Sequence, residues 1–176
     1  CDLKNGGIFA AVNPSKAKGL IAQKALWERW GHPGLRLVDS PAEVRTLVGT
    51  DRYSALLVDP TGGHFHPLNL ALGEAAAFES LGGTIHEASG VTKIERGAPA
   101  VVRTAQGQVR AQQVIVACNA YGGNLEPKLA SRSMPCGTQV IATAPLGALA
   151  DAVIPSDYCV EDNNFLLDYF RLSADK

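Results

Sequence analysis

The sequence predicts an α/β fold in two parts: part of a doubly wound sheet with a β-meander, and part of an antiparallel α+β domain. The first observation is a helix, a turn and three short alternating segments, in that order. The second is the run Val114–Cys118, which is apolar at every position, as in a strand covered on both faces. The third is the alternation over residues 138–143 and 165–172, which is typical of half-exposed antiparallel strands.

Start and stop signals predict three helices. Asn13-Pro14 begins the first, because Asn is a good N-cap and Pro is favoured at the first helical position. The pair Ser40 and Glu43 forms a capping box that begins the second, which we expect to reach about Val48. Pro67 begins the third, and Leu-Gly-Gly at 81–83 ends it.

Short apolar or alternating segments predict the strands. A strand is expected directly after Gly6-Gly7, and another over Tyr53–Val58, with a turn at 59–63. A short strand is expected at 84–88, followed by a meander over residues 91–95, 100–104 and 109–111. These strands surround the third helix, which supports the mixed α/β class.

Composition excludes several classes of protein. The 176 residues have a net charge of −1 and are 46% hydrophobic, which is too apolar for a disordered chain. Sixteen Lys+Arg against 17 Asp+Glu leave no basic excess for nucleic acid. No apolar run approaches the roughly 18–20 residues of a membrane span. The four cysteines are far apart, so we expect reduced thiols in a cytoplasmic protein.

The first residue is Cys1, and the single Met, Met134, lies deep in the chain. We therefore expect a fragment or a processed product, with some apolar surface meant to pack against other segments. Such surfaces, and an unpaired sheet edge, favour self-association.

Several motifs, taken in order, resemble the D-amino-acid oxidase-like FAD-dependent oxidoreductases. Within that family the chain is most similar to the glycine and sarcosine oxidase type, and especially to the bacterial γ-glutamylputrescine oxidoreductases. The resemblance covers essentially the whole chain. The motifs that carry it are Lys4–Gly7, Leu26–His32, Gly62–Pro67, the Leu-Gly-Gly stop at 81–83, Val91-x-x-Ile94, Val101-x-x-Thr104-x-x-Gly107 and Val114–Tyr121.

The resemblance implies a domain division and a reaction. Residues 1–62 and 127–176 would belong to a substrate domain, and residues 63–126 to the second half of an FAD-binding domain. The complete enzyme would bind FAD and an amine or amino-acid substrate. A hydride would pass from the substrate to the flavin, giving an imine and then an aldehyde or keto product. Oxidase and dehydrogenase activities both remain open.

The resemblance also implies cofactor contacts, made by backbone. Val91 would contact the adenine end of FAD, and the turn formed by Cys118, Asn119 and Ala120 would pass near the pyrophosphate and ribose. Two alternatives stay open: Val91 as a plain core residue, and Asn119 as a turn residue only. Many family members have Gly where this chain has Asn119, but Asn tolerates a left-handed backbone.

On the substrate side, the resemblance implies that Tyr169 and Arg171, on one face of the last strand, bind a carboxylate. Arg suits this because its planar fork matches a carboxylate. The alternative is a solvated strand face. His66 is a candidate substrate residue, although the sequence favours it as the cap of the helix at Pro67, with His64 on a polar surface. We expect no metal, because no further ligand accompanies the two histidines.

Two family features are missing from the sequence. No Gly-x-Gly-x-x-Gly turn is present to hold a pyrophosphate, and the C-terminal return of the flavin pocket is absent. No nucleophile arrangement identifies a catalytic residue, as is expected where a flavin accepts the hydride. We expect the isolated chain to be inactive and to bind FAD weakly or not at all. The alternative function is a non-catalytic α/β interaction module.

Overall fold

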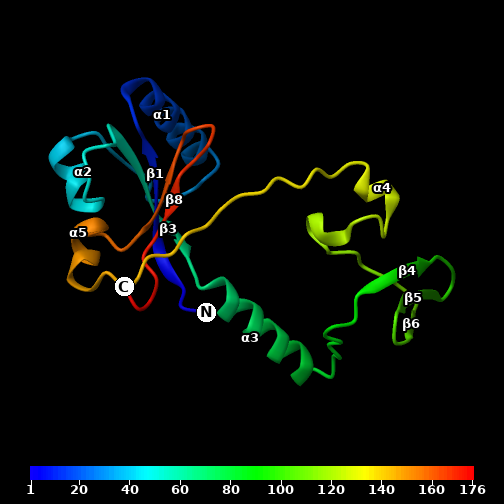
Figure 1. Ribbon diagram of the computed structural model, residues 1–176. Helices are drawn as coiled ribbons and strands as arrows, with labels where there is room; N and C mark the ends of the chain where they lie inside the picture. Colours follow the sequence, from blue (N-terminus) through cyan, green and yellow to red (C-terminus); the bar gives the residue numbers. More distant parts are fainter. The chain divides into compact units, whose positions relative to one another are not determined.

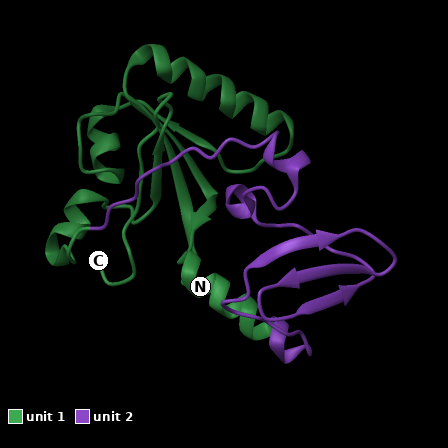
Figure 2. Ribbon diagram, turned by 45° about the vertical axis from the view of Figure 1, so that its right-hand side comes forward, with its two compact units in different colours: residues 1–77, 143–176 green, residues 78–142 purple.

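A five-stranded mixed sheet organises the residues from both ends of the chain (Figure 1). The computed structural model describes all residues 1–176. Its first compact unit comprises residues 1–77 and 143–176, and its second comprises residues 78–142 (Figure 2). The elements of the first unit are β1 (Lys4–Ala11), α1 (Pro14–Arg29), β2 (Arg36–Val38), α2 (Pro41–Leu47), β3 (Ala55–His64), η2 (Gly147–Leu149), α5 (Ala150–Val153), β7 (Cys159–Asp162) and β8 (Tyr169–Phe170).

The strand order of this sheet is β2-β3-β1-β7-β8. β1 and β7 are parallel, and the other neighbouring strands are antiparallel. The β1–β7 connection spans most of the sequence, because residues 12–158 lie between these two neighbours. The sheet is therefore complete only when the two ends of the chain meet.

Each face of this sheet has its own apolar core. One face packs against α2 and α5 through a cluster that includes Ile8, Val44 and Ile154. The other packs against α1, whose Leu20 is 1% exposed and contacts the cluster with Ala55 and Leu57. Burying one such Leu side chain is worth roughly 1.5–3 kcal/mol. The two cores fix α1 on one face and the short helices on the other (Figure 1).

β3 is longer than the sequence predicted. The turn expected at 59–63 is wrong, because Gly63 and His64 pair with Asn5 and Lys4 of β1. The register shifts between Asn5 and Gly7, which accommodates the extra residues of β3. A side chain at Gly63 would collide with the Lys4 backbone, so glycine is required at this crossing.

Of two predicted helix caps, one forms and the other does not. The N-cap at Asn13 is confirmed, since its side chain accepts a hydrogen bond of 2.9 Å from the Lys16 amide. The capping box of α2 is wrong: Ser40 makes no side-chain capping bond. Glu43, its expected partner, instead forms an ion pair with Arg36 of β2. The helix itself forms and ends at Leu47.

The second unit contains the predicted meander. β4 (Val91–Glu95), β5 (Ala100–Thr104) and β6 (Gln108–Ala111) form a separate antiparallel sheet in that order. α3 (Pro67–Ser80) leads into it, and η1 (Asn119–Gly122) and α4 (Pro127–Ala130) follow it. The short strand predicted at 84–88 is wrong, because this segment has no strand partner.

Two further predicted strands do not form. Val114–Cys118 is neither a strand nor buried, and Ile115 is 89% exposed. Residues 138–143 are also irregular, and Ile141 is 89% exposed. A strand needs neighbours that accept its backbone hydrogen bonds, and no strand of this chain lies beside either segment.

The last predicted strand, 165–172, is reduced to β8 at Tyr169–Phe170. Its partner β7 was not predicted. Asp162 explains the early end of the pairing: its buried carboxylate accepts hydrogen bonds from the amides of Asn164 and Asp168. This cap holds the chain between β7 and β8 as a loop. The fold class itself is confirmed, with a mixed sheet and a separate antiparallel sheet. No helix is long and apolar enough to cross a membrane.

Candidate functional site

One part of the five-stranded sheet is left open beside α1. Register pairs align Tyr169 with Glu161, Glu161 with Phe9, and Phe9 with Leu57 across four strands. Paired residues project from the same face, and Leu57 lies in the core beneath α1. Phe9 is covered as well, because its ring packs edge-on against Trp27 at 5.4 Å. Beyond Phe9 the same face carries exposed polar side chains.

We name this uncovered region the open sheet face and define it by Cys159, Glu161, Tyr169 and Arg171. Glu161 and Tyr169 are exposed, and Cys159 is half-buried. Arg171 follows β8 at the position opposite Cys159, one step beyond the Val160–Phe170 pair. Phe170 and Leu172 pack into the core on the other face, so alternation directs Tyr169 and Arg171 to the open side.

Arg171 is held by a residue that the sequence analysis assigned only to a polar surface. Its Nη1 lies 3.4 Å from Nδ1 of His64 and donates to the Leu172 carbonyl at 3.2 Å. Because a guanidinium only donates, Nδ1 of His64 must accept, and Nε2 then carries the proton. Nε2 lies 3.4 Å from the Asp157 carbonyl oxygen, which can receive it. His64 is buried at 7% exposure.

The carboxylate of Asp157 adds a charged network behind His64. It pairs with Lys4 at 2.7 Å and with Lys176 at 3.6 Å. Burial acts to raise the pKa of Asp157, but the hydrogen bond and charge of Lys4, with Lys176, outweigh it and lower that pKa. Asp157 therefore stays ionised and fixes the strand ends that carry His64 and Arg171.

The thiol of Cys159 lies on the same open sheet face. Its Sγ lies 3.6 Å from the Gly6 carbonyl oxygen. Burial raises the pKa of Cys159, with smaller opposing contributions from the charges of Glu161 and Arg171. The thiol is therefore protonated at neutral pH, and it does not act as a nucleophile there.

His66 lies apart from this group. Its Nδ1 accepts a hydrogen bond of 3.2 Å from the Asn69 amide, and its carbonyl accepts one from Leu70. The predicted capping of α3 is thus confirmed. No hydrogen bond joins His66 to Tyr169 or Arg171, and its role toward a substrate stays a prediction.

A second polar cluster, missed by the sequence analysis, lies along β3 of the same unit. Asp59 Oδ1 accepts from the amide and hydroxyl of Thr61 at 2.9 and 2.8 Å, and lies 3.1 Å from His32 Nε2. Burial acts to raise the pKa of Asp59, but the hydrogen bonds from Thr61 and His32 lower it overall. The contact between Asp59 and His32 was missed by the sequence analysis because a turn was predicted at 59–63.

The cofactor candidates all lie in the second unit. Val91 begins β4, pairs with Thr104 and is 39% exposed, so it is not a plain core residue in this structure. Cys118 precedes η1, and Asn119 adopts a left-handed backbone with φ of 47°. Cys118 and Asn119 are exposed, and Ala120 is half-buried. No hydrogen bond joins Val91 to this turn.

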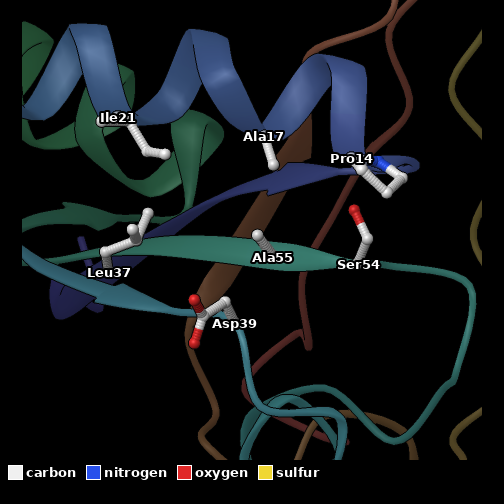
Figure 3. A pocket seen from close by; sticks show the side chains of 7 residues that line it. All are labelled: Pro14, Ala17, Ile21, Leu37, Asp39, Ser54 and Ala55. Carbon is white, nitrogen blue, oxygen red and sulfur yellow. The ribbon is translucent and has the colours of Figure 1, made fainter.

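An apolar hollow of the first unit lies elsewhere. A groove of about 230 Å³ lies between α1 and β3 (Figure 3). In Figure 3, Ala17 and Ile21 of α1 face Ala55 of β3, while the Ser54 hydroxyl points toward Pro14. None of the predicted site residues lines this groove. Tyr169 and Arg171 therefore lie outside this groove and share the open sheet face instead.

Two solved structures share this fold. L-proline dehydrogenase from P. horikoshii matches 99% of this chain and 47% of its own with a TM-score of 0.75, at 18% identity. Glycine oxidase from Geobacillus kaustophilus matches 71% of this chain and 34% of its own with a TM-score of 0.62, at 22% identity. The chain therefore shares its fold with part of each of these two proteins.

A family model, described as DAO, FAD-dependent oxidoreductase, matches residues 1–176. The chain belongs to that family. Gamma-glutamylputrescine oxidoreductase of Escherichia coli is 55% identical over 99% of this chain and 41% of its own length. The probable oxidoreductase OrdL of Haemophilus influenzae is 39% identical over 99% of this chain and 42% of its own length. The chain thus spans about two fifths of these relatives.

The family depends on FAD, and the residues present fit that cofactor in part. Cys118 and Asn119 of the turn at 118–120 are exposed, and Asn119 has the left-handed backbone that glycine favours beside a closely approaching ligand. A pyrophosphate cradle is not present, because no glycine-rich turn opens any of the helices. These residues suit one wall of a flavin site.

Proposed function

We propose that the complete protein carrying these residues oxidises the amine of a γ-glutamyl amine such as γ-glutamylputrescine. The observation that carries this proposal is the 55% identity to the Escherichia coli enzyme of that name over 99% of this chain. When bound, FAD would accept a hydride from the carbon bearing the amine, and the imine formed would hydrolyse to an aldehyde or keto product.

The first unit supplies the substrate side in this proposal. Arg171 would bind the substrate carboxylate through its guanidinium, supported by His64, and Tyr169 would add a hydroxyl and an aromatic face. Residues 1–62 and 127–176 would then belong to a substrate domain. Residues 63–126 would belong to the FAD-binding domain, in which Val91 and the turn Cys118–Ala120 would form one wall of the FAD site.

The test uses the complete FAD-loaded protein, with γ-glutamylputrescine, putrescine, glycine and sarcosine compared as substrates. We expect anaerobic bleaching of the flavin absorbance to be fastest with γ-glutamylputrescine. Oxygen consumption then distinguishes an oxidase from a dehydrogenase. Absence of flavin binding and of reduction by every amine would overturn the proposal in favour of a non-catalytic interaction module.

Two further proposals concern the isolated 176 residues. Large apolar side chains of the second unit are strongly exposed, such as Leu81, Ile115 and Ile141, and they support self-association. Sedimentation over a range of concentrations tests self-association, and a monomer at every concentration would overturn it.

We also propose a cytoplasmic location, supported by four free thiols.

A further inference from the structure

We propose that Glu161 binds the α-ammonium group of the substrate while Arg171 binds its carboxylate, so that the open sheet face recognises a zwitterionic amino-acid head group. This inference rests on the proposed function and adds a residue that determines specificity. Sequence reasoning missed Glu161 because β7, on which it lies, was not predicted.

The register brings the required charges together. Glu161 pairs directly with Tyr169, so their side chains project from the same face. Arg171 lies two residues beyond Tyr169 and is the diagonal neighbour of Glu161, with Cα atoms roughly 7–8 Å apart.

Both charges are available to a ligand. Glu161 is exposed, and its carboxylate makes no hydrogen bond or ion pair within the chain. It does not pair with Arg171, whose contacts to His64 and Leu172 use only Nη1. Nε and Nη2 of Arg171 therefore remain to bind a carboxylate. Glu161 differs in this respect from Asp157, which is paired with Lys4, and from Asp168, which is paired with Arg52.

This arrangement favours one class of amine and one orientation. An α-amino acid head group carries adjacent ammonium and carboxylate groups, and each would meet an opposite charge. The reversed orientation would place like charges together, which is unfavourable. A simple diamine would place no anion against Arg171. The face would thus favour γ-glutamyl amines over free diamines, and leave the amine at the far end of the chain for oxidation.

The test compares two substrates that differ only in the ammonium group. γ-Glutamylputrescine carries it, and N-glutarylputrescine keeps the carboxylate but lacks it. With the complete FAD-loaded enzyme, we expect Glu161→Gln to raise KM for γ-glutamylputrescine roughly tenfold with kcat unchanged, and to leave N-glutarylputrescine unaffected. Arg171→Gln should raise KM for both substrates. Glu74→Gln, on an exposed carboxylate of α3, is the control and should change neither.

A binding measurement keeps the two proposals distinguishable. γ-Glutamylbutylamide has the same head group but no amine to oxidise, and it can be titrated calorimetrically. We expect Glu161→Gln to weaken this complex and to leave the complex of N-glutarylbutylamide unchanged. Equal effects on both ligands, or none, would overturn the role of Glu161. Absence of turnover with tight, Glu161-dependent binding would count against the proposed reaction alone.

Discussion

His64 and Arg171 are separated by 107 residues in the sequence, yet Nη1 of Arg171 lies 3.4 Å from Nδ1 of His64. The contact joins the end of β3 to the residue after β8. In the sheet, β1 and β7 lie between these two strands. His64 is buried, and its other nitrogen faces the Asp157 carbonyl at 3.4 Å. The imidazole is thus set to hold the guanidinium in one position.

We predict that His64→Ala raises KM for a carboxylate-bearing amine about fivefold, with kcat little changed. The reason is the loss of one hydrogen bond that positions Arg171, worth roughly 1 kcal/mol. His64→Gln should recover most of the loss, because its amide oxygen can accept from Arg171. Steady-state kinetics of the complete enzyme measure both.

The control for this prediction is His86→Ala, since His86 is exposed in the second unit. It should leave KM unchanged. A fall in kcat without a change in KM for His64→Ala would contradict a positioning role.

Asp59 gives a prediction on stability and pH. Its carboxylate accepts two hydrogen bonds from Thr61 and lies beside His32, and its pKa is lowered from 3.8. A lowered folded-state pKa contributes stability above the unfolded pKa, and this is lost as pH falls through the folded pKa. We expect Asp59→Asn to lower the free energy of unfolding by roughly 1–3 kcal/mol at neutral pH.

The measurement is urea unfolding at neutral pH and again below the folded pKa of Asp59. The difference between wild type and Asp59→Asn should shrink in acid. Asp51→Asn, which breaks an exposed pair with Arg45, should cost less than about 1 kcal/mol. A difference for Asp59→Asn that is independent of pH would show that the ionised carboxylate is not what stabilises the fold.

The sequence predicted elements whose signals are local. Asn13-Pro14, Pro67 and the Leu-Gly-Gly stop define helix ends through backbone capping, and each helix begins where expected. The meander over 91–111 also forms, because its turns are short and its partners are neighbours in the sequence.

Elements that depend on distant partners were not predicted. β7 pairs with β1 across most of the chain, so its four residues carry no local signal that distinguishes them from a loop. Val114–Cys118 shows the converse, since its composition favours a covered strand but no strand lies beside it. Glu161 and the contact of His64 with Arg171 were missed for the same reason, because both depend on pairing between strands that are distant in the sequence. Tyr169 and Arg171 were predicted from the resemblance to a known family, and their substrate role stays a prediction.

Cys159 is predicted to react more slowly with thiol reagents than the other three cysteines. Burial raises the pKa of Cys159, so less thiolate is present at a given pH, whereas Cys1, Cys118 and Cys136 are exposed. We expect alkylation of native protein at mildly alkaline pH to label the three exposed thiols first. Peptide mass spectrometry follows each site.

Alkylation in guanidinium chloride provides the reference, where all four thiols should react at similar rates. Labelling of Cys159 at the same rate as Cys136 in the native protein would mean that β7, which lies between β1 and the edge strand β8, opens readily.

Asn119 provides a prediction for the cofactor side. Its left-handed backbone, with φ of 47°, is readily adopted by Gly and Asn but disfavoured for β-branched residues. We expect Asn119→Gly to keep FAD affinity in the complete enzyme, and Asn119→Val to weaken it roughly tenfold, since straining this turn costs about 1–2 kcal/mol. Flavin fluorescence titration measures both affinities. Asn124→Val, at a nearby exposed position without a positive φ, is the matched control and should bind FAD as wild type does. If Asn119→Val lowers stability but not FAD affinity, the turn at 118–120 lies away from the cofactor, and only its structural role remains.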